Sequence, residues 1–100
     1  MIKPTVGRVM WYRPGDYLIG LVEHDPAQPM TAHVCYVWND NMVNLLVIDH
    51  AGNTQVRTSV PIVQDGSPYT AGPSPYAEWM PFQKGQAAKT EAAEAKLAGA

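Results

Sequence analysis

The middle of the chain holds three apolar, β-rich segments separated only by short polar turns. The segments are residues 31–38 (TAHVCYVW), 42–49 (MVNLLVID) and 54–60 (TQVRTSV), and the turns are residues 39–41 and 50–53. Segments of this length, joined by Asn, Asp and Gly, predict a three-stranded antiparallel meander. Because apolar side chains of the middle segment alternate onto both faces, we expect this strand to be central or covered by another subunit.

Shorter β-rich segments flank the meander. Residues 5–12 predict one strand, residues 17–22 a second with a bulge or a bend at Gly20, and residues 76–82 a short apolar return. Residues 61–75 contain four prolines, which indicate an ordered loop or an extended edge rather than a helix. Five or six short strands without an interior helix predict an all-β fold, a small antiparallel barrel or roll. An SH3-like barrel is the first expectation and an OB-like barrel the second.

The composition changes near residue 83. Residues 1–82 hold every proline and every aromatic residue, whereas residues 83–100 are rich in alanine with lysine and glutamate. We therefore predict a β-barrel body in residues 1–82 and an alanine-rich tail in residues 83–100. The tail is expected to be helical or disordered, because an isolated helix of this length is marginally stable in water.

Charge and cysteine content exclude several classes of function. The seven basic and nine acidic side chains give a net charge of −2, which argues against generic nucleic-acid binding. Cys35 is the only cysteine, so an internal disulfide and a Cys-rich zinc site are excluded. We expect neither a metal nor a cofactor, because the three histidines are dispersed and no glycine-rich phosphate loop is present. With no apolar signal region and no long apolar run, a cytoplasmic protein without membrane contact is expected.

His33 and Cys35 are two residues apart on one predicted strand, so their side chains should share a face. A thiolate beside an imidazole is the beginning of a nucleophilic pair. Spacing is the only support for this pair, and cysteine is often buried simply for packing. We therefore favour a structural role for both residues and predict no enzymatic activity.

Several aromatic side chains of the body stand beside isolated cations and hydroxyls. A ring stacks on a base, a guanidinium forms two hydrogen bonds to a phosphate, and hydroxyls complete the hydrogen bonding. This combination predicts a site for a planar anionic ligand. The candidate ligand-binding residues are Arg8, Trp11, Tyr12, Trp38, Arg57, Thr58, Ser59 and Trp79. The same tryptophans are suited to filling a small core or an oligomer interface, which is the competing interpretation.

Short motifs spread over residues 3 to about 86 resemble a group of phage proteins. The motifs are Lys3-Pro4-Thr5-Val6-Gly7-Arg8-Val9 before Trp11-Tyr12, Val43-Asn44-Leu45, Asp49-x-x-Gly52-Asn53, Thr58-Ser59-Val60 and Glu78-Trp79-Met80-Pro81. They are similar to small uncharacterised accessory proteins of tailed phages and prophages. The resemblance implies host manipulation, including sequestration of immune signalling nucleotides, or a small part in the particle. It supplies no catalytic residues.

The sequence thus supports two hypotheses. The first is a non-enzymatic phage-type binding protein, a homo-oligomer in the host cytoplasm that sequesters a small phosphorylated ligand such as a cyclic nucleotide signal. Arg8 and Arg57 would contact phosphate, aromatic rings would stack, and Thr58 and Ser59 would orient the ligand. The alternative is a phage structural or protein-interaction module that docks on a phage or host protein through its tail.

Overall fold

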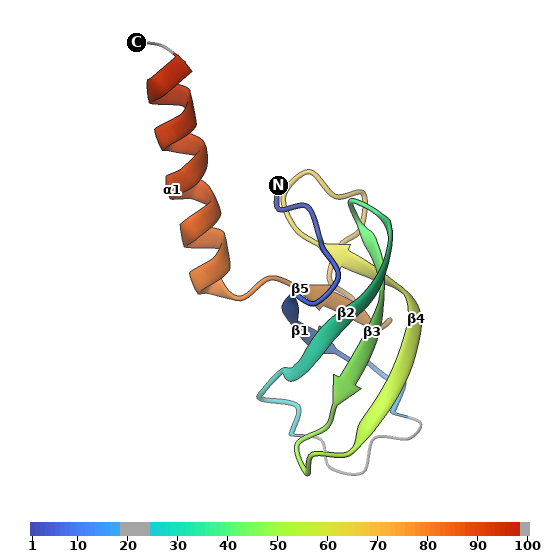
Figure 1. The fold of residues 1–100 in the computed structure, drawn as a ribbon. Helices are drawn as coiled ribbons and strands as arrows, with labels where there is room; N and C mark the ends of the chain where they lie inside the picture. Colours follow the sequence, from blue (N-terminus) through green and yellow to red (C-terminus); the bar gives the residue numbers. More distant parts are fainter. Residues whose placement is uncertain (19–24, 99–100) are drawn as a thin grey trace.

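The computed structural model describes residues 1–18 and 25–98. The described elements are β1 (Val9–Arg13), β2 (Met30–Asn39), β3 (Met42–Ile48), β4 (Thr54–Val63), β5 (Tyr76–Glu78) and α1 (Pro81–Ala98). The strands form a closed barrel in the order β1-β2-β3-β4-β5, and β5 returns beside β1 (Figure 1). The predicted small barrel is confirmed. It is not wholly antiparallel, because β4 and β5 run parallel after a connection long enough to permit it.

The predicted meander corresponds to β2, β3 and β4. In β3, Val43, Leu45 and Val47 are fully buried, whereas the alternate apolar side chains are half-buried. β3 pairs with β2 on one side and β4 on the other, as every strand of this closed barrel pairs with two neighbours, so β3 has no free edge. β4 continues past Pro61 into the segment expected to be a loop or edge. There the Ile62 N–H donates a hydrogen bond of 2.8 Å to the Asn41 carbonyl.

The first predicted strand is shorter in the structure. β1 begins at Val9 instead of residue 5, because Gly7 adopts a φ of 93° and its N–H donates to the Val34 carbonyl at 2.8 Å. The next predicted strand, residues 17–22, falls mostly outside the described residues, and Gly20 is among those outside. Tyr17 and Leu18, its described part, lie in no strand.

The barrel interior contains apolar side chains from every strand and from the residue after β5. The two largest are Tyr12 and Trp79, both 0% exposed. Their rings pack with the core cluster formed by Met10, Met30, Ala32, Val34, Val43, Leu45, Val47, Val60, Ile62 and Ala77. Two of the rings expected to stack on a ligand therefore belong to the core, as the competing interpretation of the aromatic residues requires.

Asp49 organises the turn between β3 and β4. Its buried carboxylate accepts hydrogen bonds at Oδ1 from the backbone N–H groups of Ala51, at 2.9 Å, and Asn53, at 2.8 Å. Its Oδ2 accepts a third from the Asn53 Nδ2 at 3.3 Å. Aspartate is favoured in turns because its short side chain satisfies nearby backbone donors.

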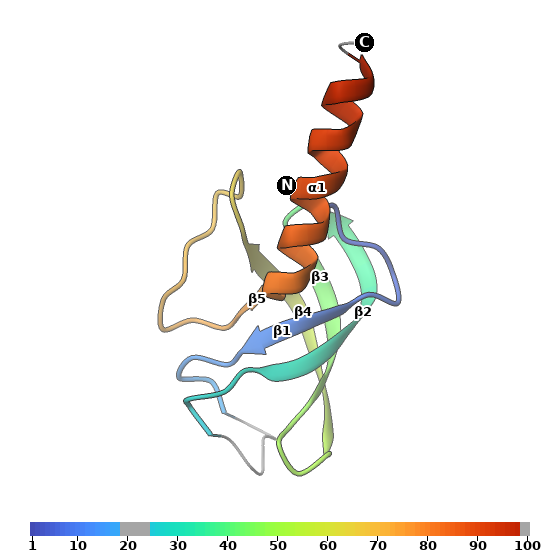
Figure 2. The ribbon, with the colours of Figure 1, turned by 90° about the vertical axis from the view of Figure 1, so that its left-hand side faces the viewer.

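Helix α1 is tied to the barrel at its first turn. Pro81 is its first residue, and the Gln83 Oε1 accepts a hydrogen bond of 2.8 Å from the Met80 N–H, one half of a capping box. The Gln83 Nε2 donates to the Val9 carbonyl of β1 at 2.8 Å. Further along, the helix projects away from the barrel (Figures 1 and 2). Its surface is mostly exposed because the sequence provides no apolar stripe to bury. In the described chain, no helix has the length and apolarity needed to cross a membrane.

Candidate functional site

A cavity of about 450 Å³ opens beside β4, and we refer to it as the β4 pocket. Its lining consists of residues 56–61 of β4, the core residue Tyr12 of β1, and Tyr17, Ser74 and Pro75 from the loops. Its volume lies within the range typical of small-molecule sites. The polar side chains that line it are Tyr12, Tyr17, Arg57, Thr58, Ser59 and Ser74.

A β-bulge places the β4 residues of this pocket. Leu45 of β3 pairs with Arg57 and Val43 pairs with Val60, so Thr58 and Ser59 together face the single residue Asn44. Ser59 has a φ of 54°, a left-handed conformation uncommon for residues other than glycine. The bulge takes the Ser59 N–H out of the backbone hydrogen bonding between β3 and β4. This N–H instead donates a hydrogen bond of 2.8 Å to the Asn44 Oδ1. Bulges redirect side chains and are enriched beside functional sites.

Arg57 dominates the electrostatics of the β4 pocket. Its register opposite Leu45 directs it towards the barrel interior, and its guanidinium lies 5.0 Å from the ring centroid of Tyr17. Burial raises the pKa of Tyr12, and the positive charge of the nearby Arg57 partly opposes that shift. Among the described residues that line the pocket, only Arg57 carries a charge at neutral pH. The pocket is therefore suited to an anion.

Two distant loops complete the pocket because Gly15 allows them to pack closely. Gly15 has a φ of 57°, and a Cβ at this position would overlap the Pro73 carbonyl. The Asp16 N–H donates to that same carbonyl at 2.9 Å. This contact brings the turn before Tyr17 against the segment containing Ser74. Neither Tyr17 nor Ser74 was a candidate from the sequence, in which only the Pro-Gly turn beside Tyr17 is a local signal.

The structure divides the eight predicted ligand-binding residues among separate places. Tyr12, Arg57, Thr58 and Ser59 meet in the β4 pocket. Arg8 instead lies over the Trp79 ring, 5.1 Å from its centroid, and neither residue lines that pocket.

The two remaining predicted residues lie on the barrel exterior. Trp11 lies beside Arg13, whose guanidinium is 5.7 Å from the ring centroid. Trp38 is 55% exposed near the end of β2, where it packs edge-on against Tyr36 and donates to the Asn44 Oδ1 at 2.8 Å. The spacing of these aromatic residues in the sequence did not reveal that they occupy different surfaces.

His33 and Cys35 do not form a nucleophilic pair in this structure. A register irregularity between Val34 and Tyr36 interrupts the alternation at Cys35. Both side chains are exposed, and the Cys35 Sγ lies 3.6 Å from the backbone carbonyl of His33. In the described ranges, no three His, Cys, Asp or Glu side chains form a group that could hold a metal ion.

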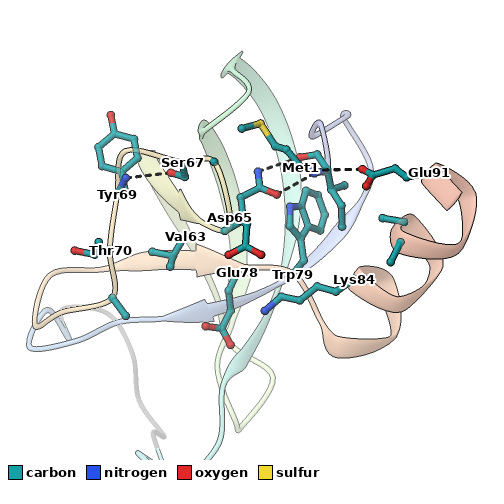
Figure 3. Close-up of a pocket in the computed structure, with 16 residues that line it drawn as sticks. Met1, Val63, Asp65, Ser67, Tyr69, Thr70, Glu78, Trp79, Lys84 and Glu91 are labelled. Atoms are coloured by element: carbon teal, nitrogen blue, oxygen red, sulfur yellow. Dashed lines mark hydrogen bonds and ion pairs between the residues drawn. The ribbon is translucent and has the colours of Figure 1, made fainter. Parts of the chain in front are cut away.

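A larger cavity of about 640 Å³ lies at one end of the barrel, against α1, and we refer to it as the helix pocket (Figure 3). Its walls are residues 1–2, the segment between Val63 and Ala71, Glu78 with Trp79, and the side of α1 from Lys84 to Glu91. Trp79 is therefore both a core residue and part of a cavity wall.

Comparisons with known proteins identify no relative of this chain. No family model matches it, and no curated protein or solved structure matches it. The phage-protein resemblance therefore stays a prediction. Functional inference depends on the geometry of the two pockets.

Proposed function

We propose that the protein binds a small phosphorylated ligand in the β4 pocket and releases it chemically unchanged. The observation that carries this proposal is the placement of Arg57 among the hydroxyl groups of Thr58, Ser59 and Ser74. A guanidinium offers a fork of N–H donors that matches the oxygen atoms of a phosphate, and hydroxyls add further donors around the same group.

The aromatic part of the pocket favours a ligand with a flat ring. Tyr17 lies at the pocket wall against the Arg57 guanidinium, so a base held beside it would stay close to the phosphate partner. A cyclic nucleotide has this combination of phosphate and planar base. We therefore propose cyclic nucleotides as the ligand class.

Binding without turnover is proposed because of the side chains that line the pocket. General acid–base catalysis needs a group that titrates near the working pH. Among the described lining residues, the titratable groups besides Arg57 are two tyrosines, and burial raises the pKa of Tyr12 further from neutrality. These side chains are suited to holding an anion.

Thermal unfolding with a panel of cyclic mono- and dinucleotides, and with inorganic phosphate, tests the proposal. A true ligand present at about a hundredfold excess over its Kd stabilises the folded chain by about 2.7 kcal/mol. Arg57→Ala should abolish this shift, whereas Arg57→Lys should retain part of it through charge alone. Lys89→Ala is the control, because it removes one positive charge from the exposed surface of α1.

Three results would contradict the proposal. The first is no shift with any member of the panel. The second is a ligand-induced thermal shift that Arg57→Ala leaves intact, which would place the ligand elsewhere. If Arg8→Ala abolished that shift instead, the ligand would be located near Trp79. The third is recovery of a chemically altered ligand after denaturation, which would indicate an enzyme.

A second candidate function is a protein-interaction module that docks on a phage or host protein or on further copies of itself. The supporting observation is the exposed helix, on which Leu97 is 77% exposed. Deletion of residues 84–100 should then abolish association, measured as native mass by light scattering. Association that survives this deletion would refute the role of the helix, and Arg57→Ala should leave it unchanged.

We also propose the SH3-like subtype for the barrel. Its support is the strand order, in which β1 to β4 follow one another around the barrel and β5 returns to β1. An OB-like barrel has a Greek-key strand order instead.

A further inference from the structure

The helix pocket contains a buried hydrogen-bond donor with no protein partner. Trp79 is 0% exposed, and its indole Nε1 has no hydrogen-bond partner in the described part of the chain. A buried indole N–H usually finds an acceptor, because leaving such a donor unsatisfied costs about 1–3 kcal/mol. Trp79 also lines the helix pocket, which is the cavity from which a bound molecule could supply the missing acceptor (Figure 3).

Several polar groups that line the helix pocket are already engaged with the protein. Glu78 pairs with Arg13 at 3.4 Å, and Glu91 pairs with the amino group of Met1 at 3.5 Å. The Gln64 side chain exchanges two hydrogen bonds of 3.0 Å with the backbone of Ile2.

Two opposite charges remain at the wall of the helix pocket. Within the residues that the structure describes, Asp65 and Lys84 have no ion-pair partner. Asp65 follows β4, and Lys84 lies in the first turn of α1, so they approach the cavity from different elements (Figure 3). The remaining lining includes Val63, Ala87 and Ala88, which give part of the wall an apolar character.

We propose that the helix pocket binds a small zwitterion of the amino-acid or dipeptide class. Asp65 accepts hydrogen bonds from the ammonium group, Lys84 donates to the carboxylate, and Trp79 donates to an oxygen of the ligand. The apolar side chain of the ligand packs against the alanines of α1. This site is separate from the β4 pocket and does not depend on the function proposed there.

The Trp79 indole N–H is a direct probe of this site. Full-length ¹⁵N-labelled protein has three tryptophans, and Trp11→Phe and Trp38→Phe identify the Trp79 indole signal by elimination. The probes are phenylalanine, N-acetylphenylalanine, which lacks the ammonium group, and phenylalaninamide, which lacks the carboxylate. We expect phenylalanine to shift the Trp79 signal saturably, and each blocked compound to bind about tenfold more weakly, because each loses one charge-assisted contact.

Two surface variants assign the charges without changing the core. Asp65→Asn should weaken phenylalanine binding about tenfold and remove its advantage over N-acetylphenylalanine. Lys84→Gln should likewise weaken phenylalanine binding about tenfold, and it should remove the advantage of phenylalanine over phenylalaninamide. Lys89→Gln, on the same helix but outside the pocket lining, should leave binding unchanged.

The proposal is overturned if phenylalanine fails to move the Trp79 signal at any soluble concentration. It is also overturned if the signal moves equally with all three compounds, or if neither pocket variant weakens binding. Arg57→Ala should leave this titration unaffected, so failure at one pocket is distinguishable from failure at the other.

Discussion

Replacement of Gln83 by alanine should release α1 from the barrel. The Gln83 side chain accepts one hydrogen bond from the Met80 N–H and donates another to the Val9 carbonyl, each at 2.8 Å. A hydrogen bond of this kind contributes about 1 kcal/mol net, and a helix-capping interaction contributes a similar amount. Loss of both contacts therefore weakens the attachment by about 2 kcal/mol, which is about thirtyfold in an opening equilibrium.

Amide hydrogen exchange at Met80 measures this opening directly, because that N–H is the donor that Gln83 protects. We expect about a thirtyfold loss of protection in Gln83→Ala. Gln83→Glu is the matched variant: its carboxylate still accepts from Met80 and is favourable at a helix N-terminus, but it has no N–H for Val9. The protection of Met80 should therefore fall less in Gln83→Glu, by about fivefold.

Unchanged protection of Met80 in Gln83→Ala would refute the reasoning, since it would mean that other contacts hold the helix. Equal losses in the alanine and glutamate variants would show that the Val9 contact alone matters. Because α1 forms a wall of the helix pocket, Gln83→Ala should also weaken phenylalanine binding at Trp79.

Two further predictions concern stability. Asp49→Ala removes the acceptor of two backbone N–H groups and should lower the free energy of unfolding by about 2 kcal/mol, whereas Asp49→Asn keeps an Oδ1 acceptor and should lose less than about 1 kcal/mol. In thermal unfolding, the Tm of the alanine variant should be lower by about 8–16 °C. If the alanine and asparagine variants lost equal stability, the effect would be assigned to the charge of Asp49. Gly85→Ala should stabilise α1 by about 1 kcal/mol, because an added Cβ meets no atom within 4 Å. The helical circular-dichroism signal at 222 nm should therefore increase. Gly52→Ala, equally open but at a φ of 89°, should destabilise the chain instead, and a gain there would contradict the argument from backbone conformation.

The strands of the barrel were largely predictable because their signals are local. Alternation of apolar residues and the short polar turns identified β2, β3 and the beginning of β4, and the change of composition near residue 83 placed the helix within two residues of its start. The early start expected for β1 was wrong, because the turn at Gly7 depends on a hydrogen bond to Val34.

The candidate sites were only partly predictable, because they depend on contacts between distant residues. Residue type alone indicated that Arg57, Thr58 and Ser59 were suited to an anionic ligand. Their meeting with Tyr17 depends on the packing of Gly15 against Pro73, and the Pro-Gly turn beside Tyr17 does not indicate which distant segment packs there.

The sequence by itself determined that this chain forms a small barrel, because the alternation of side chains in a strand is a local property. Only the tertiary structure decided which aromatic residues fill the core and which line a cavity. The bulge opposite Asn44 changes the face to which the following residues of β4 point, and a shift of one residue exchanges the two faces of a strand. Trp79 was a candidate ligand contact from its type, but the closure of the barrel buried its ring, placed the residue beside the helix pocket and left its N–H without a partner among the described residues.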